Sequence, residues 1–220
     1  MNRPLSMAVR TGGAAVLLLA LCSLGACSSA LKSTAPAEQI YVLQPMAAPA
    51  AGGALPVGGL LSVQRPVVQP GLATMRIALT RPGNRLDYYA GSRWGAQLPQ
   101  VVDAFATQSL VASGRFELVS GGERGSGGAR FELALTVRHF EAEYRDDGDG
   151  APQARVGFEC VLSAGTPRRP LGRCDAAAVV PATANRMGPI VQALEAAAQQ
   201  AMAQVIEQAA QLAAAPPAAR

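Results

Sequence analysis

The sequence predicts an α+β fold, in which two helices pack on one face of a largely antiparallel, mixed sheet. Seven short segments alternate apolar and polar residues or are rich in β-branched residues, which is typical of strands. Two longer segments place apolar residues three or four positions apart, as one face of a helix requires. The order is three strands, a helix, four strands and a helix, and it suggests one α+β domain.

Three strands and a helix are expected in the first half of the folded part. The strands fall at residues 40–43, 60–64 and 75–80. Residues 46–59 consist largely of Ala, Gly and Pro and predict a loop, and turns are expected at 66–71 and 82–84. The helix begins at Leu98, has a Pro in its first turn and stops at Gly114.

Four strands and a long helix are expected in the second half. The strands fall at residues 115–120, 131–144, 156–162 and 171–180. In the second of these strands the apolar residues change sides near Arg138 and His139, which predicts a β-bulge or a sharp twist. Apolar residues from Ile190 to Leu212 trace one stripe, with Gln and Glu over the remaining surface, so we expect an amphipathic helix that ends before Pro216.

The N-terminus has the features of a secretory signal. Two Arg precede an apolar run at residues 14–21, which is too short to span a bilayer. The sequence Leu24-Gly25-Ala26-Cys27 follows and resembles the bacterial lipoprotein box, in which a peptidase cuts before a Cys that becomes lipidated. We expect Cys27 to carry acyl chains, palmitate among them; the alternative is an ordinary signal peptide with an incidental Cys.

These features divide the chain into four predicted parts. They are a signal peptide at 1–26, the lipidated Cys and a flexible tether at 27–37, a single periplasmic α+β domain at 38–214, and a disordered tail at 215–220. A tether of this composition has a root-mean-square reach of roughly 17 Å. In enteric bacteria an Asp after the lipidated Cys favours inner-membrane retention, and Ser28 departs from that rule. We therefore expect the periplasmic face of the outer membrane.

Charge and composition exclude several classes of function. The formal net charge of +4 falls to +2 once Arg3 and Arg10 leave with the signal peptide, which is too little for a nucleic-acid binder. His139 is the single histidine, and with Glu141 it supplies fewer than the three or four ligands that a metal site needs. The acidic run at 146–149 lacks the distal Glu of a calcium loop and predicts a turn. We expect no metal, no cofactor and no enzymatic activity, because no nucleophile, phosphate-loop or dinucleotide motif occurs.

Besides the lipidated Cys27, two cysteines remain in the mature chain. If the hairpin that joins their strands is symmetric about Pro167, Cys160 and Cys174 lie opposite each other. A bond between them would close a loop of about fifteen residues and add roughly 3 kcal/mol in the chain-entropy model. Disulfides persist in the periplasm, so a bond is favoured, and two buried free thiols are the alternative.

An aromatic segment precedes the first helix in a chain that is poor in aromatic residues. It contains Tyr88, Tyr89, Arg93 and Trp94, which is the single tryptophan. Trp, Tyr and Arg are the residues most often found at binding hot spots, so these four are candidate interface residues. The alternative is that Trp94 closes the core beside the first helix.

Several short stretches together resemble the ABC-type transport auxiliary lipoprotein family. They are Tyr41-Val42-Leu43, Arg76-Ile77-Ala78-Leu79, Leu86-Asp87-Tyr88-Tyr89, Arg93-Trp94 and Ser113-Gly114-Arg115-Phe116. The resemblance covers most of the mature chain, including the Ala-rich C-terminal helix, and rests on the order and spacing of the stretches. The loop at 46–59 and the Cys pair depart from the family pattern.

The resemblance implies a non-catalytic accessory subunit of a lipid transport system. Its partners would be a mammalian-cell-entry-domain protein with its permease and ATPase, and some members of the family form homo-oligomeric rings. The subunit would dock the periplasmic conduit to the outer membrane. Two other functions remain open at this point: an outer-membrane lipoprotein that activates a cell-wall synthase, and a direct periplasmic lipid carrier.

Overall fold

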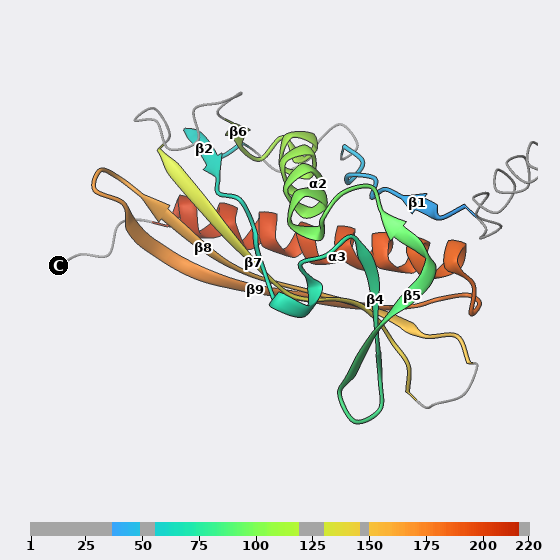
Figure 1. The fold of residues 1–220 in the computed structure, drawn as a ribbon. Coiled ribbons are helices and arrows are strands. Elements are labelled where there is room, and N and C mark those ends of the chain that lie inside the picture. The colour runs from blue at the N-terminus through green and yellow to red at the C-terminus, as the bar shows by residue number, and fades with distance from the viewer. Residues whose placement is uncertain (1–36, 49–55, 119–129, 146–149, 216–220) are drawn as a thin grey trace, which may run out of the picture. The chain divides into compact units, whose positions relative to one another are not determined.

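In the described part of the chain, nine strands form one mixed sheet, and two α-helices lie against it (Figure 1). The computed structural model describes residues 37–48, 56–118, 130–145 and 150–215. The chain divides into two units, Met1–Ala37 and Glu38–Arg220, and the described residues from Glu38 onward belong to the second. The α+β class predicted from the sequence is confirmed.

The strands are short before the first helix, apart from β5, and mostly long after it. They are β1 (Gln39–Tyr41), β2 (Leu60–Val63), β3 (Val67–Val68), β4 (Arg76–Arg81), β5 (Arg85–Trp94), β6 (Glu117–Leu118), β7 (Phe131–Glu143), β8 (Gln153–Ala164) and β9 (Arg169–Pro181). The helices are the 3-10 turn η1 (Pro70–Leu72), α2 (Leu98–Ser113) and α3 (Met187–Ala214).

The central strand of the sheet is β7. The order runs β1-β5-β4-β7-β2-β6, and β7 also pairs with β3 and with β8, which pairs in turn with β9. Among the described residues, five of the eight pairings are parallel and three are antiparallel. The two longest pairings, β7 with β8 and β8 with β9, are antiparallel, because each pair is joined directly by one loop.

Two strands were not predicted. The first is β5, whose pairing with β4 shifts register between Arg76 and Ala78 and whose Gly91 has a φ of 65°. This irregularity interrupts the two-residue period by which a strand is recognised. The second is β3, which is two residues long and lies in a segment predicted to be a turn.

The predicted change of face in β7 is confirmed. The register between β7 and β8 shifts between Val137 and His139, so the strand contains a β-bulge. As a result Val137 and Phe140 both lie in the core, each no more than 1% exposed, although they are three residues apart. The bulge therefore keeps one continuous apolar face along the whole length of β7.

Both helices pack into a single core cluster. Helix α2 ends at Gly114, whose φ of 64° is the left-handed conformation of a helix stop. Helix α3 lies along β8 and β9, and the two helices contact each other. The buried face of α3 is rich in Ala, which allows close approach to strands that themselves carry Ala154, Ala176 and Ala178. No helix in the described part of the chain is long and apolar enough to cross a membrane.

Candidate docking surface

Trp94 belongs to the core and not to the molecular surface. Its side chain is 1% exposed and packs edge to face against Phe140, with ring centroids 5.8 Å apart. It stands at the end of β5, where it is paired with Tyr41 of β1, shortly before α2 begins. The structure therefore corrects the candidate interface role of Trp94. The residue occupies the core position, which was the alternative.

The two neighbouring tyrosines are half-buried, and their hydroxyl groups are used within the chain. The Tyr88 hydroxyl donates to the Gly71 carbonyl at 2.7 Å, and the Arg76 guanidinium lies 4.0 Å from the centre of the Tyr88 ring. The Tyr89 hydroxyl lies 3.0 Å from that of Tyr144. Burial raises the pKa of Tyr89, and the hydrogen bond with Tyr144 raises it further. Tyr88 thus ties β5 to the 3-10 turn η1, and Tyr89 ties β5 to the residue that follows β7.

Arg93 is paired with Ile40 of β1, which is the strand at that end of the described sheet. Its Nε is 2.8 Å from a carboxylate oxygen of Glu38, and its Nη1 is 3.6 Å from the Met75 sulfur. Its side chain is 34% exposed. Arg93 therefore fastens the start of the folded unit to β5 and borders the surface described next.

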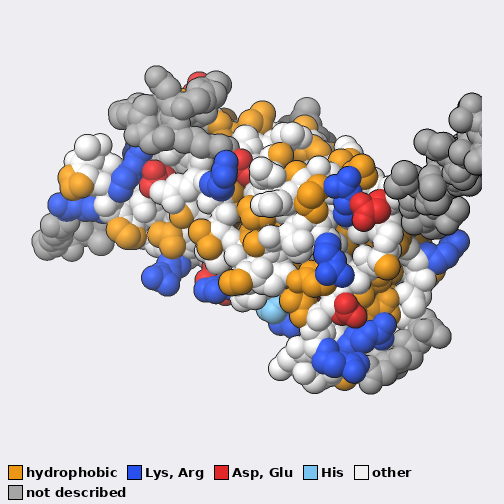
Figure 2. All heavy atoms as spheres, viewed as in Figure 1, with side chains coloured by type: hydrophobic (Ala, Val, Ile, Leu, Met, Phe, Trp, Pro, Cys, Tyr) orange, Lys and Arg blue, Asp and Glu red, His pale blue; other side chains and the backbone are white. Residues whose placement is uncertain are grey.

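An apolar groove of about 270 Å³ lies between the end of β1 and helix α2. Its lining comprises Tyr41, Val42, Leu43, Gly95, Ala96, Gln100, Val101, Ala104, Phe105 and Gln108. All ten side chains are uncharged. Hydrophobic side chains reach the surface between α2 and β1 in the view of Figure 2. The groove arises because Leu98, Val102 and Phe105 turn one face of α2 into the core and leave the adjoining flank without cover.

The segment that follows β1 is held in place by side chains of both helices. The Gln44 backbone N–H donates to Glu195 of α3 at 2.8 Å. The Gln199 amide donates to the carbonyls of Gln44 and Pro45, each at 3.3 Å. The Met46 N–H donates to the Ser109 hydroxyl of α2 at 3.1 Å. These bonds hold the three residues that directly follow Leu43, the last residue of the β1 side of the groove.

A second hollow, of about 520 Å³, lies on the sheet beside the Cys pair and has a polar lining. Arg138 donates to Glu159 at 2.6 Å. The hydrogen bond from Arg138 holds the pKa of Glu159 below its ordinary value, and the same bond raises the pKa of Arg138. The charges here neutralise each other, which leaves the hollow without a strong preference for a charged ligand.

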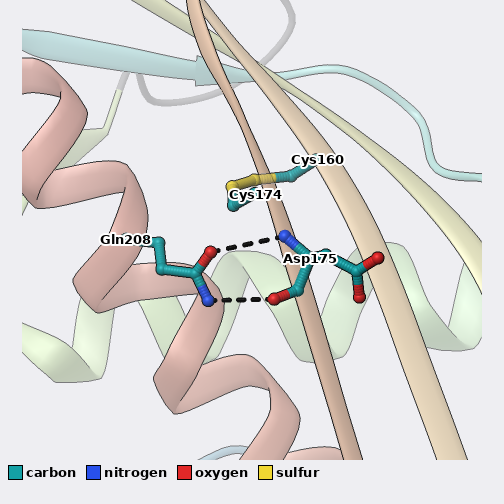
Figure 3. Close-up of a disulfide and its surroundings, with 4 residues drawn as sticks. All are labelled: Cys160, Cys174, Asp175 and Gln208. Carbon is teal, nitrogen blue, oxygen red and sulfur yellow. Dashed lines mark hydrogen bonds between the residues drawn. A yellow bond between two sulfur atoms is a disulfide. The ribbon is translucent and has the colours of Figure 1, made fainter.

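Cys160 and Cys174 are joined by a disulfide (Figure 3). They are paired directly across β8 and β9, the register expected for a hairpin centred on Pro167. Next to them, Gln208 of α3 accepts from the Asp175 N–H at 3.3 Å and donates to its carbonyl at 3.0 Å. The disulfide and Gln208 therefore secure the same part of β9.

His139 forms a pair with one carboxylate. Its Nδ1 lies 2.8 Å from Glu141, which is buried and also accepts from the Phe140 N–H at 2.6 Å. Within the described ranges, no group of three or more His, Cys, Asp or Glu side chains is placed to hold a metal ion. Cys27 and the acidic run at 146–149 lie outside the described residues.

The aromatic cluster predicts candidate residues close to the groove in the sequence, but none of the four lines the groove. The signal that could have found it is the short β-branched run 40–43 followed by Pro45. The sequence predicts a strand for this run but not a site. Whether one edge of a strand is exposed depends on which other strands pair with it, and the sequence alone does not give that pairing.

Comparisons with known proteins agree with this architecture. A family model for the ABC-type transport auxiliary lipoprotein component matches residues 41–206. The crystal structure of protein XCC0632 from Xanthomonas campestris, of the family model DUF330, has a TM-score of 0.68 and 18% identity, covering 79% of this chain and 96% of that chain. A crystal structure of an uncharacterized protein has a TM-score of 0.58 and 17% identity, covering 79% and 99%.

A third structure, of protein CT253 from Chlamydia trachomatis, has a TM-score of 0.47 and 10% identity, covering 72% of this chain and 99% of that chain. No curated protein sequence matches the chain. The two solved structures with TM-scores of 0.68 and 0.58 show a shared fold, and the family model covers well over half of the chain. The chain belongs to the family of ABC-type transport auxiliary lipoprotein components.

Proposed function

We propose that the protein is a non-catalytic outer-membrane lipoprotein subunit of an ABC-type lipid transport system. It docks the periplasmic conduit, a mammalian-cell-entry-domain protein that works with a permease and an ATPase, to the outer membrane. The observation that carries this proposal is the match of residues 41–206 to the transport auxiliary family. The sequence Leu24-Gly25-Ala26-Cys27 ahead of the matched region supports a lipid anchor.

The described surface supports binding as the activity. The groove beside α2 is apolar and uncharged, as the core of a protein-binding site typically is. By contrast, two pairs of ionisable side chains on the sheet, Arg138 with Glu159 and His139 with Glu141, are engaged with each other. Their arrangement favours a structural role.

The anchor and the tether define how docking is achieved. Several acyl chains on Cys27, at about 0.8 kcal/mol per buried CH₂, hold the protein on its membrane without further affinity. Ser28 favours the outer membrane, and the ten residues 28–37 let the folded unit move near the membrane surface. A high effective concentration then allows a modest interface to capture its partner.

The test is an affinity purification of the full-length lipidated protein from detergent-solubilised envelopes, with quantitative mass spectrometry of the co-purifying proteins. The proposal predicts enrichment of a mammalian-cell-entry-domain protein and its permease. A Cys27→Ala variant, which has no lipid anchor, is the control and should leave the membrane fraction. Enrichment of a cell-wall synthase instead would contradict the transport role. Native mass spectrometry of the same eluate determines whether the subunit forms a ring.

A further inference from the structure

The exposed edge of β1 and the groove beside it form one continuous surface. The geometry points to strand addition at this surface: β1 takes up an extended, uncharged segment of the partner protein as a further strand, which continues into the groove beside α2. This inference rests on the proposed function, because it specifies how the docking partner is bound. Such recognition combines backbone hydrogen bonds with pockets for side chains.

The backbone of β1 has one bonded side and one open side. Gly95 N–H donates to the Tyr41 carbonyl at 2.9 Å, so the polar backbone groups of Tyr41 turn toward β5. Because these groups alternate along a strand, those of Ile40 turn the other way. Among the described residues, β5 is the strand that pairs with β1, and Ile40 and Val42 are 58% and 61% exposed. An unpaired edge of this kind is a template for another chain.

The groove determines the chemistry of the added segment. It starts where β1 ends, and Val42 lies at the junction, so a chain paired with β1 can continue along the groove wall. Its volume of about 270 Å³ is suited to a few apolar side chains. The charged residues Arg93 and Glu38 form an ion pair with each other at 2.8 Å and do not line the groove. An uncharged apolar segment is therefore the complementary ligand, since a charge placed there would lose its hydration without gaining a partner.

A protein segment fits this surface better than the membrane does. Hydrocarbon cannot accept the hydrogen bonds of the Ile40 edge, and each unsatisfied backbone group in a bilayer costs several kcal/mol. The length of the segment between Cys27 and Glu38 limits how far β1 can lie from the anchoring membrane. Its ten residues span at most about 36 Å when fully extended. Any protein that reaches the anchoring membrane comes within that distance of β1.

Photo-crosslinking in intact envelopes tests the inference. The photoreactive amino acid p-benzoylphenylalanine replaces Val42 in the full-length lipidated protein, and mass spectrometry identifies the crosslinked peptide. Val67 on β3, which is 64% exposed, provides the matched control position. We expect Val42 to yield a crosslink to an uncharged, apolar segment of a partner protein, and Val67 to yield none to that segment.

A backbone variant separates strand addition from simple contact. Ile40→Pro removes the outward N–H but leaves the bonds of Tyr41 to β5, and it should lower the crosslink yield about tenfold. Ile40→Val keeps the N–H and should leave the yield unchanged. Should Ile40→Pro lower the melting temperature, Ala104→Arg replaces it, because that exposed position puts a charge in the groove without touching β1. It should cause a loss of the same size.

Any other result of the crosslinking experiment overturns the inference. Crosslinks from Val42 to lipid, to a second copy of the chain, or to nothing would exclude a partner strand, and so would a yield that neither Ile40→Pro nor Ala104→Arg lowers. The two proposals fail separately. Recovery of the transport proteins without the Val42 crosslink refutes strand addition alone. A strand-dependent crosslink to a protein outside any transport system refutes the transport role alone.

Discussion

At the scale of single residues, the disulfide shows how local pairing is converted into stability. Cys160 and Cys174 are 2% and 4% exposed and face each other across the β8–β9 hairpin. The position of Pro167 predicts their register, and the periplasmic location expected for the chain favours the bond that the structure contains. Their sequence separation of 14 residues defines the loop that the disulfide closes.

Loss of this disulfide should lower the free energy of unfolding by roughly 3 kcal/mol, since the bond restricts the unfolded chain more than the folded one. The change is Cys160→Ser combined with Cys174→Ser, and urea denaturation measures the result. Wild-type protein reduced with dithiothreitol serves as control and should show the same loss. Equal stability of all three forms would exclude a stabilising role for the disulfide.

Trp94→Ala should destabilise the protein by about 3–5 kcal/mol, because it empties a fully buried site against Phe140. Val67→Ala is the matched control at an exposed position and should change stability by less than about 0.5 kcal/mol. Thermal and urea unfolding of both variants give the comparison. A Trp94→Ala variant with wild-type stability that fails to bind the partner would contradict the core position.

The Arg138–Glu159 pair predicts a specific pH dependence. The hydrogen bond from Arg138 lowers the pKa of Glu159 from its ordinary value of 4.5. Its contribution to stability is therefore present above pH 4.5 and is lost as the pH falls through the lowered pKa. Arg138→Gln should raise the pKa of Glu159, which an NMR titration of the carboxyl carbon detects. An unchanged titration midpoint would show that the pair does not form in solution.

At the scale of elements, the sequence predicted the features that follow from the local spacing of apolar residues. It missed the features that depend on which strands and helices lie side by side. Helix α2 has the predicted bounds, 98–113, because the spacing of apolar residues and Gly114 determine them locally. The bulge in β7 followed from the change of apolar face. Strand β5 was missed because its register shift breaks the two-residue period. The groove was missed because it exists only once β1 and α2 are side by side.

The free edge of β9 is covered by side chains of α3. Gln208 bonds both backbone groups of Asp175, and the Gln204 amide donates to the Ala177 carbonyl at 3.3 Å. Edge strands that lack such cover invite pairing with other chains. The polar stripe of α3 therefore protects one edge of the sheet, whereas β1 has β5 as its paired strand among the described residues and no such helix cover there.

Gln208→Ala should destabilise the protein by about 1 kcal/mol and should raise the hydrogen-exchange rate of the Asp175 amide. The matched control is Gln211→Ala, one turn away, because the Gln211 amide donates to Glu207 on the same helix. Exchange measured by mass spectrometry on the β9 peptide distinguishes the two variants. Identical exchange in both would mean that the contact between α3 and the β9 edge has no energetic effect.

At the scale of the whole molecule, we expect the proposed tether at residues 28–37 to determine how strongly a modest interface acts. The effective concentration of a tethered domain falls with about the −3/2 power of tether length once the tether exceeds the span it must bridge. Extending residues 28–37 with Gly and Ser to roughly three times their length should lower partner recovery from envelopes about fivefold. The lipid anchor and the folded unit are unchanged in this variant, so membrane fractionation and thermal unfolding should match the wild type. Undiminished recovery would mean that the interface captures its partner without help from the anchor, and complete loss would mean that the tether sets a fixed distance between membrane and conduit.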